Sequence, residues 1–167
     1  MNGLVEQYKQ LHNEGKFQGF SVLEHAEHIG KLIQETGSKS VLDYGCGKGR
    51  QYSIHGINGT WSIESLRLYD PAVPGFDTKP EPADCVICCD VMEHIPESDV
   101  PTTLRKVLSL ARKLAFFVIC TRASKKLLPD GRNCHLTIKP EDWWNDAIER
   151  ERRGKPCRVV TVFRGGL

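Results

Sequence analysis

The segment VLDYGCGKGR, residues 41–50, decides the fold of this 167-residue chain. Residues 40–44 have the pattern of a buried strand, Asp43 lies near its carboxyl end, and glycines alternate with other residues at positions 45, 47 and 49. Glycine adopts backbone conformations that other residues avoid and lets the main chain approach a ligand closely. The pattern therefore indicates a ligand site in the loop after a first strand.

Strands and helices alternate through the rest of the sequence. Further strands are predicted over residues 66–70, 84–90, 114–120 and 158–163. Helices are predicted over residues 4–17, from a Ser21–Glu24 capping box to Gly37, after a cap at Ser98 or Asp99, and from Pro140 onward. This alternation predicts an α/β fold with a mainly parallel sheet, helices on its faces and a ligand crevice at the carboxyl ends of the strands.

A dinucleotide-binding loop is one interpretation of the glycines. Its fingerprint, GxGxxG or GxGxxA, needs a small third residue to pack the helix against the strand. Arg50 stands at that position. A nicotinamide oxidoreductase is therefore disfavoured.

A second acid follows the loop, because Asp70 ends the strand predicted over residues 66–70. An Asp-x-Gly-x-Gly loop with such an acid resembles the S-adenosylmethionine (SAM) motif of class I methyltransferases. In that resemblance the glycine loop passes beneath the methionine part of SAM. Asp70 is then expected to accept hydrogen bonds from the ribose hydroxyls.

A further motif, DCVICCDVMEHI at residues 84–95, resembles the fourth-strand signature of many small-molecule methyltransferases. Together the motifs imply a single Rossmann-like domain over residues 1–167 with a reduced, mainly parallel sheet, and a helical segment 1–37 that covers the cleft. The flanking sequence, including GRNCHLTIKPEDWW at 131–144, is similar to small phage-borne methyltransferases. The resemblance assigns SAM contacts to Asp43, Tyr44, Gly45, Cys46, Gly47, Lys48, Asp70, Pro71, Cys89, Asp90 and Val91.

One part of the family's fold has too little sequence to form. Only thirteen residues separate Asp70 from Asp84, and four of them are prolines. A helix, a strand and a second helix do not fit in that length, so we expect the third strand of the full fold to be missing. Residues 71–76, or a partner, must then cover the adenine end of the pocket.

Methyl transfer from SAM needs an aligned nucleophile and a group that accepts its proton. His94 and His135 are the candidate bases, because the pKa of histidine lies near working pH. We expect His135 to face the transferred methyl group, with Glu93 and His94 on the opposite wall. Of the adjacent Trp143 and Trp144, one is expected to pack in the core and the other to be free to cover the substrate.

The acceptor is narrowed by absent motifs. No Asn/Asp-Pro-Pro-aromatic motif and no Pro-Cys nucleophile follow the strand at residues 84–90, which argues against the common DNA methyltransferases. An O or N nucleophile of a small molecule is the expected acceptor. Two alternatives remain open, namely a non-catalytic SAM-binding module and a metal-assisted O-methyltransferase acting on an RNA end.

The metal-assisted alternative comes from a second resemblance. Asp90, Glu93, His94 and His135 are similar to the metal-binding set of the small-RNA 3′-end and ubiquinone-pathway O-methyltransferases. Oxygen and imidazole ligands of this kind suit Mg²⁺ or Mn²⁺. Because the Asp-Val-Met-Glu-His sequence also occurs in metal-free relatives, no metal ligand is assigned.

Composition sets the remaining expectations. A net charge of +2 does not indicate a nucleic-acid partner, although it leaves one open. The longest apolar run, residues 114–120, is far shorter than the roughly 20 residues that span a bilayer. Seven cysteines, an odd number, without a signal peptide predict reduced thiols and a cytoplasmic protein. The oligomeric state stays open.

Overall fold

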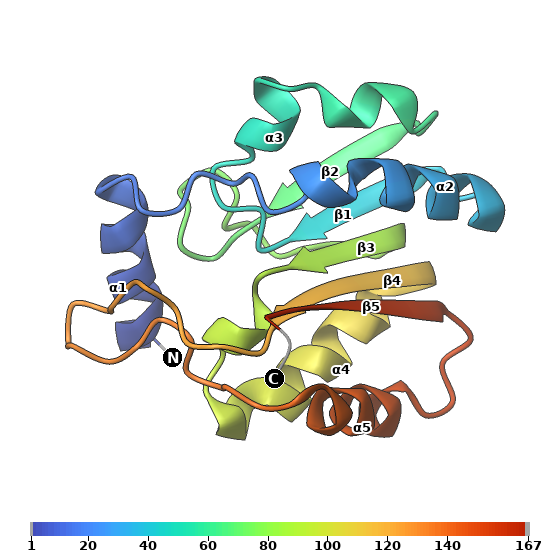
Figure 1. The fold of residues 1–167 in the computed structure, drawn as a ribbon. Coiled ribbons are helices and arrows are strands. Elements are labelled where there is room, and N and C mark those ends of the chain that lie inside the picture. The colour runs from blue at the N-terminus through green and yellow to red at the C-terminus, as the bar shows by residue number, and fades with distance from the viewer. Residues whose placement is uncertain (1, 166–167) are drawn as a thin grey trace.

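A single parallel sheet of five strands runs through the computed structural model, which describes residues 2–165 (Figure 1). Its strand order is β2-β1-β3-β4-β5, and all four neighbouring pairs are parallel. The strands are β1 (Ser40–Tyr44), β2 (Ser65–Tyr69), β3 (Ala83–Cys89), β4 (Ala111–Cys120) and β5 (Arg158–Arg164). The expected α/β fold with a parallel sheet is confirmed, while Met1 and residues 166–167 of the expected domain lie outside the described part.

Helices cover both faces of the sheet. The α-helices are α1 (Asn2–Asn13), α2 (Ala26–Thr36), α3 (Arg50–Ser53), α4 (Val100–Leu110) and α5 (Glu141–Arg152). Four 3-10 turns accompany them: η1 (Leu23–His25), η2 (Ile57–Thr60), η3 (Met92–His94) and η4 (Glu97–Asp99). Figure 1 shows α2 on one face, α4 and α5 on the other, and α1 at the edge where the strands end.

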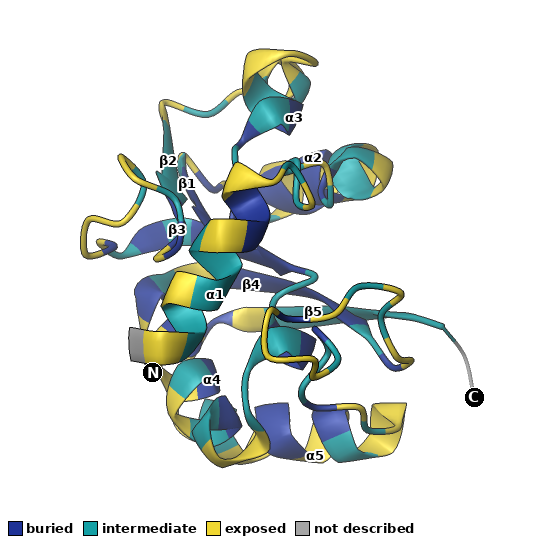
Figure 2. Ribbon diagram, turned by 90° about the vertical axis from the view of Figure 1, so that its left-hand side faces the viewer, coloured by how far each residue is buried: buried dark blue, intermediate teal, exposed yellow. Residues whose placement is uncertain are grey.

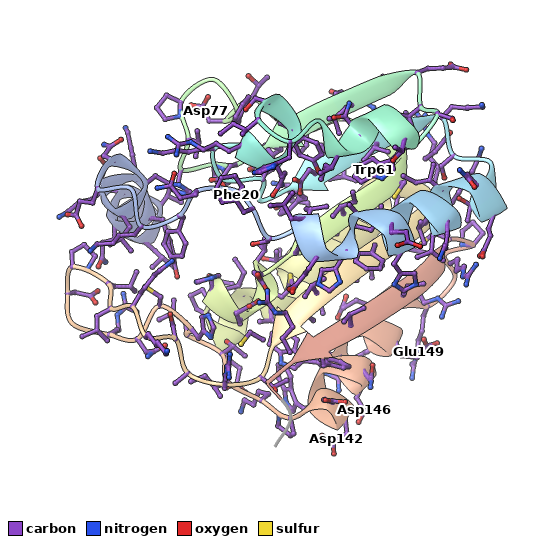
Figure 3. The ribbon with its side chains drawn as sticks, turned by 45° about the horizontal axis from the view of Figure 1, so that its top comes forward. Phe20, Trp61, Asp77, Asp142, Asp146 and Glu149 are labelled. Atoms are coloured by element: carbon purple, nitrogen blue, oxygen red, sulfur yellow. The ribbon has the colours of Figure 1, made fainter. Side chains whose placement is uncertain are left out.

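The two faces of the central strands carry two separate apolar cores. Cys85 packs with Ile29 and Trp61 on the α2 side, and Cys88 packs with Leu104 and Trp144 on the α4 and α5 side. Cys85 and Cys88, three residues apart on β3, therefore point to opposite faces of the sheet and cannot bind one metal ion together. Figure 3 shows Trp61 beside α2, where its indole nitrogen donates a hydrogen bond of 3.0 Å to the carbonyl of Ala26.

The predicted start of the helix after Ser21 is wrong. The chain forms the 3-10 turn η1 first, and α2 begins only at Ala26, without a side-chain cap. Glu24 makes no capping box, because its carboxylate lies 3.1 Å from the Arg164 guanidinium instead. Gly37 does end the helix, in the left-handed conformation that glycine favours.

The segment between β2 and β3 contains no strand in the described structure, as its length predicted. Residues 70–76 form compact turns, in which the amide of Asp70 donates to the carbonyl of Phe76 at 2.9 Å. The strand β2 is therefore the edge of the sheet.

A third, smaller core joins α1 to the segment between β4 and α5. Leu11 is buried there against Leu128 and Cys134. Figure 2 shows that α1 also carries exposed residues. Glu6 and Gln10 are among the exposed residues of this helix. No helix in residues 2–165 is long and apolar enough to cross a membrane.

Candidate active site

A cavity of about 900 Å³ opens at the carboxyl ends of the first three strands. Its walls come from α1, residues 16–24, the glycine loop, the ends of β2 and β3, and the start of α4. Ten of the eleven residues predicted to contact SAM line it: Asp43, Tyr44, Gly45, Cys46, Gly47, Asp70, Pro71, Cys89, Asp90 and Val91. Lys48 does not, so its predicted place in the pocket is wrong.

The glycine loop is packed too closely for side chains. Gly45 has φ +85°, and a Cβ atom there would lie 2.3 Å from a methyl carbon of Val91. Gly47 has φ +56°, and its Cβ would lie 3.2 Å from the Cα of Gly19. The loop after β1 is thus held between the loop after β3 and the segment after α1.

Asp43 fixes the loop to the short helix that follows it. Its buried carboxylate accepts hydrogen bonds from the Gln51 amide at 2.8 Å and from the Tyr52 hydroxyl at 2.9 Å. Burial raises the pKa of Asp43 to about 7, although these two hydrogen bonds act in the opposite direction. The geometry of the loop therefore depends on α3 as well as on glycine.

Asp70 connects the end of β2 to the glycine loop. One carboxylate oxygen accepts the amide hydrogen of Gly47 at 2.9 Å, and the other accepts that of Ala72, also at 2.9 Å. The imidazole of His12 lies 3.9 Å from the first oxygen. Each carboxylate oxygen has two lone pairs, so both can accept a further hydrogen bond from a ligand.

A charged pair lies on the other side of β1 from Asp70, because β1 stands between β2 and β3 in the sheet. Asp90, in the left-handed conformation with φ +53°, pairs with Arg164 at 2.8 Å. The same guanidinium also reaches Glu24. The second carboxylate oxygen of Asp90 is buried and has no hydrogen-bond partner in the described chain. This oxygen can accept a hydrogen bond from a cationic ligand group.

The ring of His94 lines the cavity and has a defined tautomer. Its Nδ1 lies 2.9 Å from the carbonyl of Cys134, which can only accept a hydrogen bond, so Nδ1 carries the proton. Tyr8 donates its hydroxyl hydrogen to the same carbonyl at 2.8 Å. Burial, followed by the nearby His135, lowers the pKa of His94 to about 3. His94 is therefore neutral near pH 7, with an unprotonated Nε2.

The predicted arrangement of the other two catalytic candidates is wrong. Neither Glu93 nor His135 lines the cavity, and the His135 ring packs against His94 at 4.9 Å between ring centroids rather than facing it across the cleft. Glu93 is buried, and its carboxylate accepts the amide hydrogen of Cys120 at 3.1 Å. Both residues thus lie behind His94, because η3 turns the Glu93 side chain toward β4.

Trp143 also departs from its predicted place. Trp144 is fully buried in the core, as expected of one member of the pair. Trp143 packs against the edge of the same core with Lys139 above its ring, and it does not line the cavity. Figure 3 shows that Asp142, Asp146 and Glu149 occupy the outward side of α5.

Comparison with known families agrees with this geometry. The family described as a methyltransferase domain matches residues 22–157, which is most of the chain. The chain belongs to this methyltransferase domain family. Searches among curated proteins and among solved structures found no match.

Several residues of the cavity were not found from the sequence. Three such residues line the cavity: Arg164 from β5, Gly19 from the segment after α1, and Lys106 from α4. Tyr8 orients His94 from the first helix of the chain. Only Gly19 had a signal in the sequence, because a glycine outside the motif often marks a left-handed turn, which Gly19 does adopt. The sequence did not show that this turn packs against the glycine loop.

Proposed function

We propose that this methyltransferase domain transfers the methyl group of SAM to an oxygen or nitrogen atom of a small molecule. The observation that carries the proposal is the bond between Asp70 and the Gly47 amide at the wall of the cavity, because it joins the two motifs on which the SAM resemblance rests. A volume of about 900 Å³ is in the upper range for small-molecule sites and leaves room for an acceptor beside the cofactor.

The two ends of the cavity suit the two ends of SAM. Asp70, with its free lone pairs, is the proposed acceptor for the ribose hydroxyls, and Pro71 and Ala72 stand next to it for the adenine. The unpaired oxygen of Asp90 suits the ammonium group of the methionine part. The Arg164 guanidinium is the nearby cation for the carboxylate.

SAM supplies an activated methyl group, so the protein needs to orient the acceptor and receive its proton. We assign the proton to Nε2 of His94, since Nδ1 is already protonated against the Cys134 carbonyl. The low pKa keeps this nitrogen unprotonated at neutral pH, although it also makes the histidine a weak base. His94 therefore suits an acceptor atom whose proton becomes more acidic as the methyl group is transferred.

The acceptor subsite is proposed to lie next to His94. The side chains around it are mostly apolar and include Leu4, Val5, Phe17 and Ile95. They exclude water from the reacting atoms and favour a small, partly apolar acceptor over a polymer.

A cytoplasmic setting is proposed because all seven cysteines are free.

Calorimetric titration with SAM and with S-adenosylhomocysteine tests the cofactor. Asp70→Ala is expected to weaken binding by about 1.5 to 3 kcal/mol, roughly 10-fold to 150-fold, and Asp70→Asn by less. Asp77→Ala is the matched control, because Asp77 is an exposed acid on the same segment (Figure 3). Equal affinity of the wild type and Asp70→Ala would remove the ribose role.

Conversion of SAM to S-adenosylhomocysteine, measured with a panel of small hydroxyl and amine acceptors, tests catalysis. His94→Ala is expected to lower turnover by about 10² to 10⁴, the usual size of a general-base effect, with little change in SAM affinity. His55→Ala, at an exposed histidine, serves as the control. SAM binding without turnover on any acceptor would favour the non-catalytic module.

A further inference from the structure

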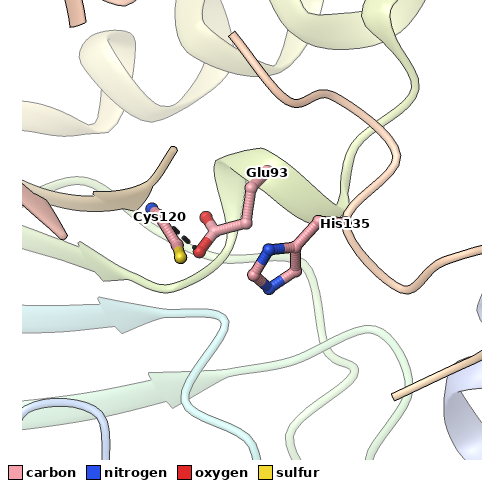
Figure 4. A group of neighbouring side chains, drawn as sticks. All are labelled: Glu93, Cys120 and His135. Atoms are coloured by element: carbon pink, nitrogen blue, oxygen red, sulfur yellow. Dashed lines mark hydrogen bonds between the residues drawn. The ribbon is translucent and has the colours of Figure 1, made fainter. Parts of the chain in front are cut away.

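A cluster of three possible metal ligands lies outside the cavity. Glu93, Cys120 and His135 each place one ligand atom within 4.8 Å of the other two (Figure 4). They come from η3, the last residue of β4 and the segment before α5. None of the three lines the cavity, so the cluster is separate from the proposed SAM and acceptor subsites.

The Glu93 carboxylate of this cluster has one oxygen without a partner. One carboxylate oxygen of Glu93 accepts the Cys120 amide hydrogen, while the other is buried without a hydrogen-bond partner in the described chain. Leaving a buried carboxylate oxygen unpaired is costly, and a bound ion is one way in which native proteins satisfy such a group. The Cys120 thiol and the His135 ring are only partly buried, so an ion can reach them.

We propose that Glu93, Cys120 and His135 bind a zinc ion. Carboxylate, thiolate and imidazole are the three ligand types that zinc takes in proteins, at about 2.0 to 2.3 Å. Tetrahedral ligands at those distances are roughly 3.2 to 3.8 Å apart, so the three side chains need to move by about 1 Å or less. The carboxylate and the thiolate together balance the charge of the ion.

The donor set differs from the one predicted from the metal-assisted O-methyltransferases. Asp90 and His94 are not part of the cluster, and a thiolate enters it. Sulfur favours zinc over Mg²⁺ or Mn²⁺, which prefer oxygen. An ion here lies behind the His94 ring rather than at the acceptor subsite, so it is not placed to activate the acceptor.

The proposed ion would hold three segments in place around His94. The carbonyl of Glu93 already accepts the amide hydrogens of Leu136 and Thr137, and Cys134 orients the His94 ring. An ion bound by Glu93 and His135 would add a second link between η3 and the segment before α5. Zinc is therefore expected to stabilise the wall that carries His94.

Cobalt(II) and zinc titrations of the metal-free, reduced protein test the proposal directly. One Co²⁺ per chain is expected, with the near-ultraviolet charge-transfer absorption of a cobalt–thiolate bond, and Zn²⁺ should displace it and raise the melting temperature. Neither readout needs SAM or an acceptor, so failure of the proposed methyl transfer would not affect it. A wild-type protein without stoichiometric binding, or with bound cobalt but no thiolate band, would overturn the site.

Substitutions then identify the ligands. Cys120→Ser should remove the thiolate band, and His135→Ala or Glu93→Gln should weaken zinc binding at least about 10-fold. Cys157→Ser and His55→Ala are the matched controls and should bind as the wild type does. Circular dichroism of each metal-free variant checks folding. A thiolate band that persists in a folded Cys120→Ser protein would place the metal on another cysteine and refute the assignment.

Discussion

Replacement of Gly45 by alanine tests whether the two motif loops meet as the structure has them. The left-handed backbone at φ +85° is expected to cost about 1 to 2 kcal/mol once a Cβ is present. The new Cβ would also lie 2.3 Å from one methyl carbon of Val91 and 3.2 Å from the other. Relieving such overlap typically costs a further 1 to 3 kcal/mol or so, which gives a total of about 2 to 5 kcal/mol.

A double-mutant cycle separates the two costs. Val91→Ala removes both methyl carbons and leaves its Cβ, which lies 3.3 Å from the added atom. The Gly45→Ala and Val91→Ala double variant should therefore recover about 1 to 3 kcal/mol relative to the sum of the single effects, while the backbone cost remains.

Urea denaturation, followed by fluorescence of the buried tryptophans, measures these free energies of unfolding. Gly37→Ala is the matched control, because Gly37 has φ +58° and nothing within 4 Å of its added Cβ. It should lose about 1 to 2 kcal/mol and show no coupling to Val91→Ala. If Gly45→Ala and Val91→Ala were additive within about 0.5 kcal/mol, the contact between the two motif loops would be refuted.

Three further predictions concern single side chains. The folded-state pKa of Asp43, about 7, lies above the unfolded value, so the contribution of this group to stability is complete at low pH and is lost as pH rises from about 4 to 7. Urea denaturation should show this fall in the free energy of unfolding for the wild type and not for Asp43→Asn. The same pH dependence in both proteins would contradict the prediction. Tyr8→Phe should cost about 1 kcal/mol of stability, the value of one hydrogen bond to the Cys134 carbonyl, and an unchanged urea midpoint would argue against that bond. Trp144→Ala should cost about 3 to 5 kcal/mol and Trp143→Ala much less, because only Trp144 is fully buried, and equal losses would contradict this packing.

Local sequence patterns predicted most of the fold because each strand carries its own signal. The run of apolar residues in β3 and β4 is typical of strands covered on both faces, and each was predicted to within a few residues. The start of α2 was missed because Glu24 had two possible partners. Its carboxylate pairs with Arg164 instead of forming the capping box with Ser21. Arg164 is 140 residues away in the sequence and becomes a neighbour of Glu24 only in the folded chain.

The sequence by itself determined the parallel α/β fold, the glycine loop, Asp70 as the acid beside it, and the methyltransferase family. These features follow from neighbouring residues, whose spacing fixes strand ends and backbone conformation. Only the tertiary structure decided how side chains from separate elements combine. The Cys134 carbonyl accepts hydrogen bonds from both His94 and Tyr8, which come from different elements. Glu93, Cys120 and His135 come together outside the cavity. The direction in which η3 turns its side chains depends on packing against β4 and α1, which no local pattern records.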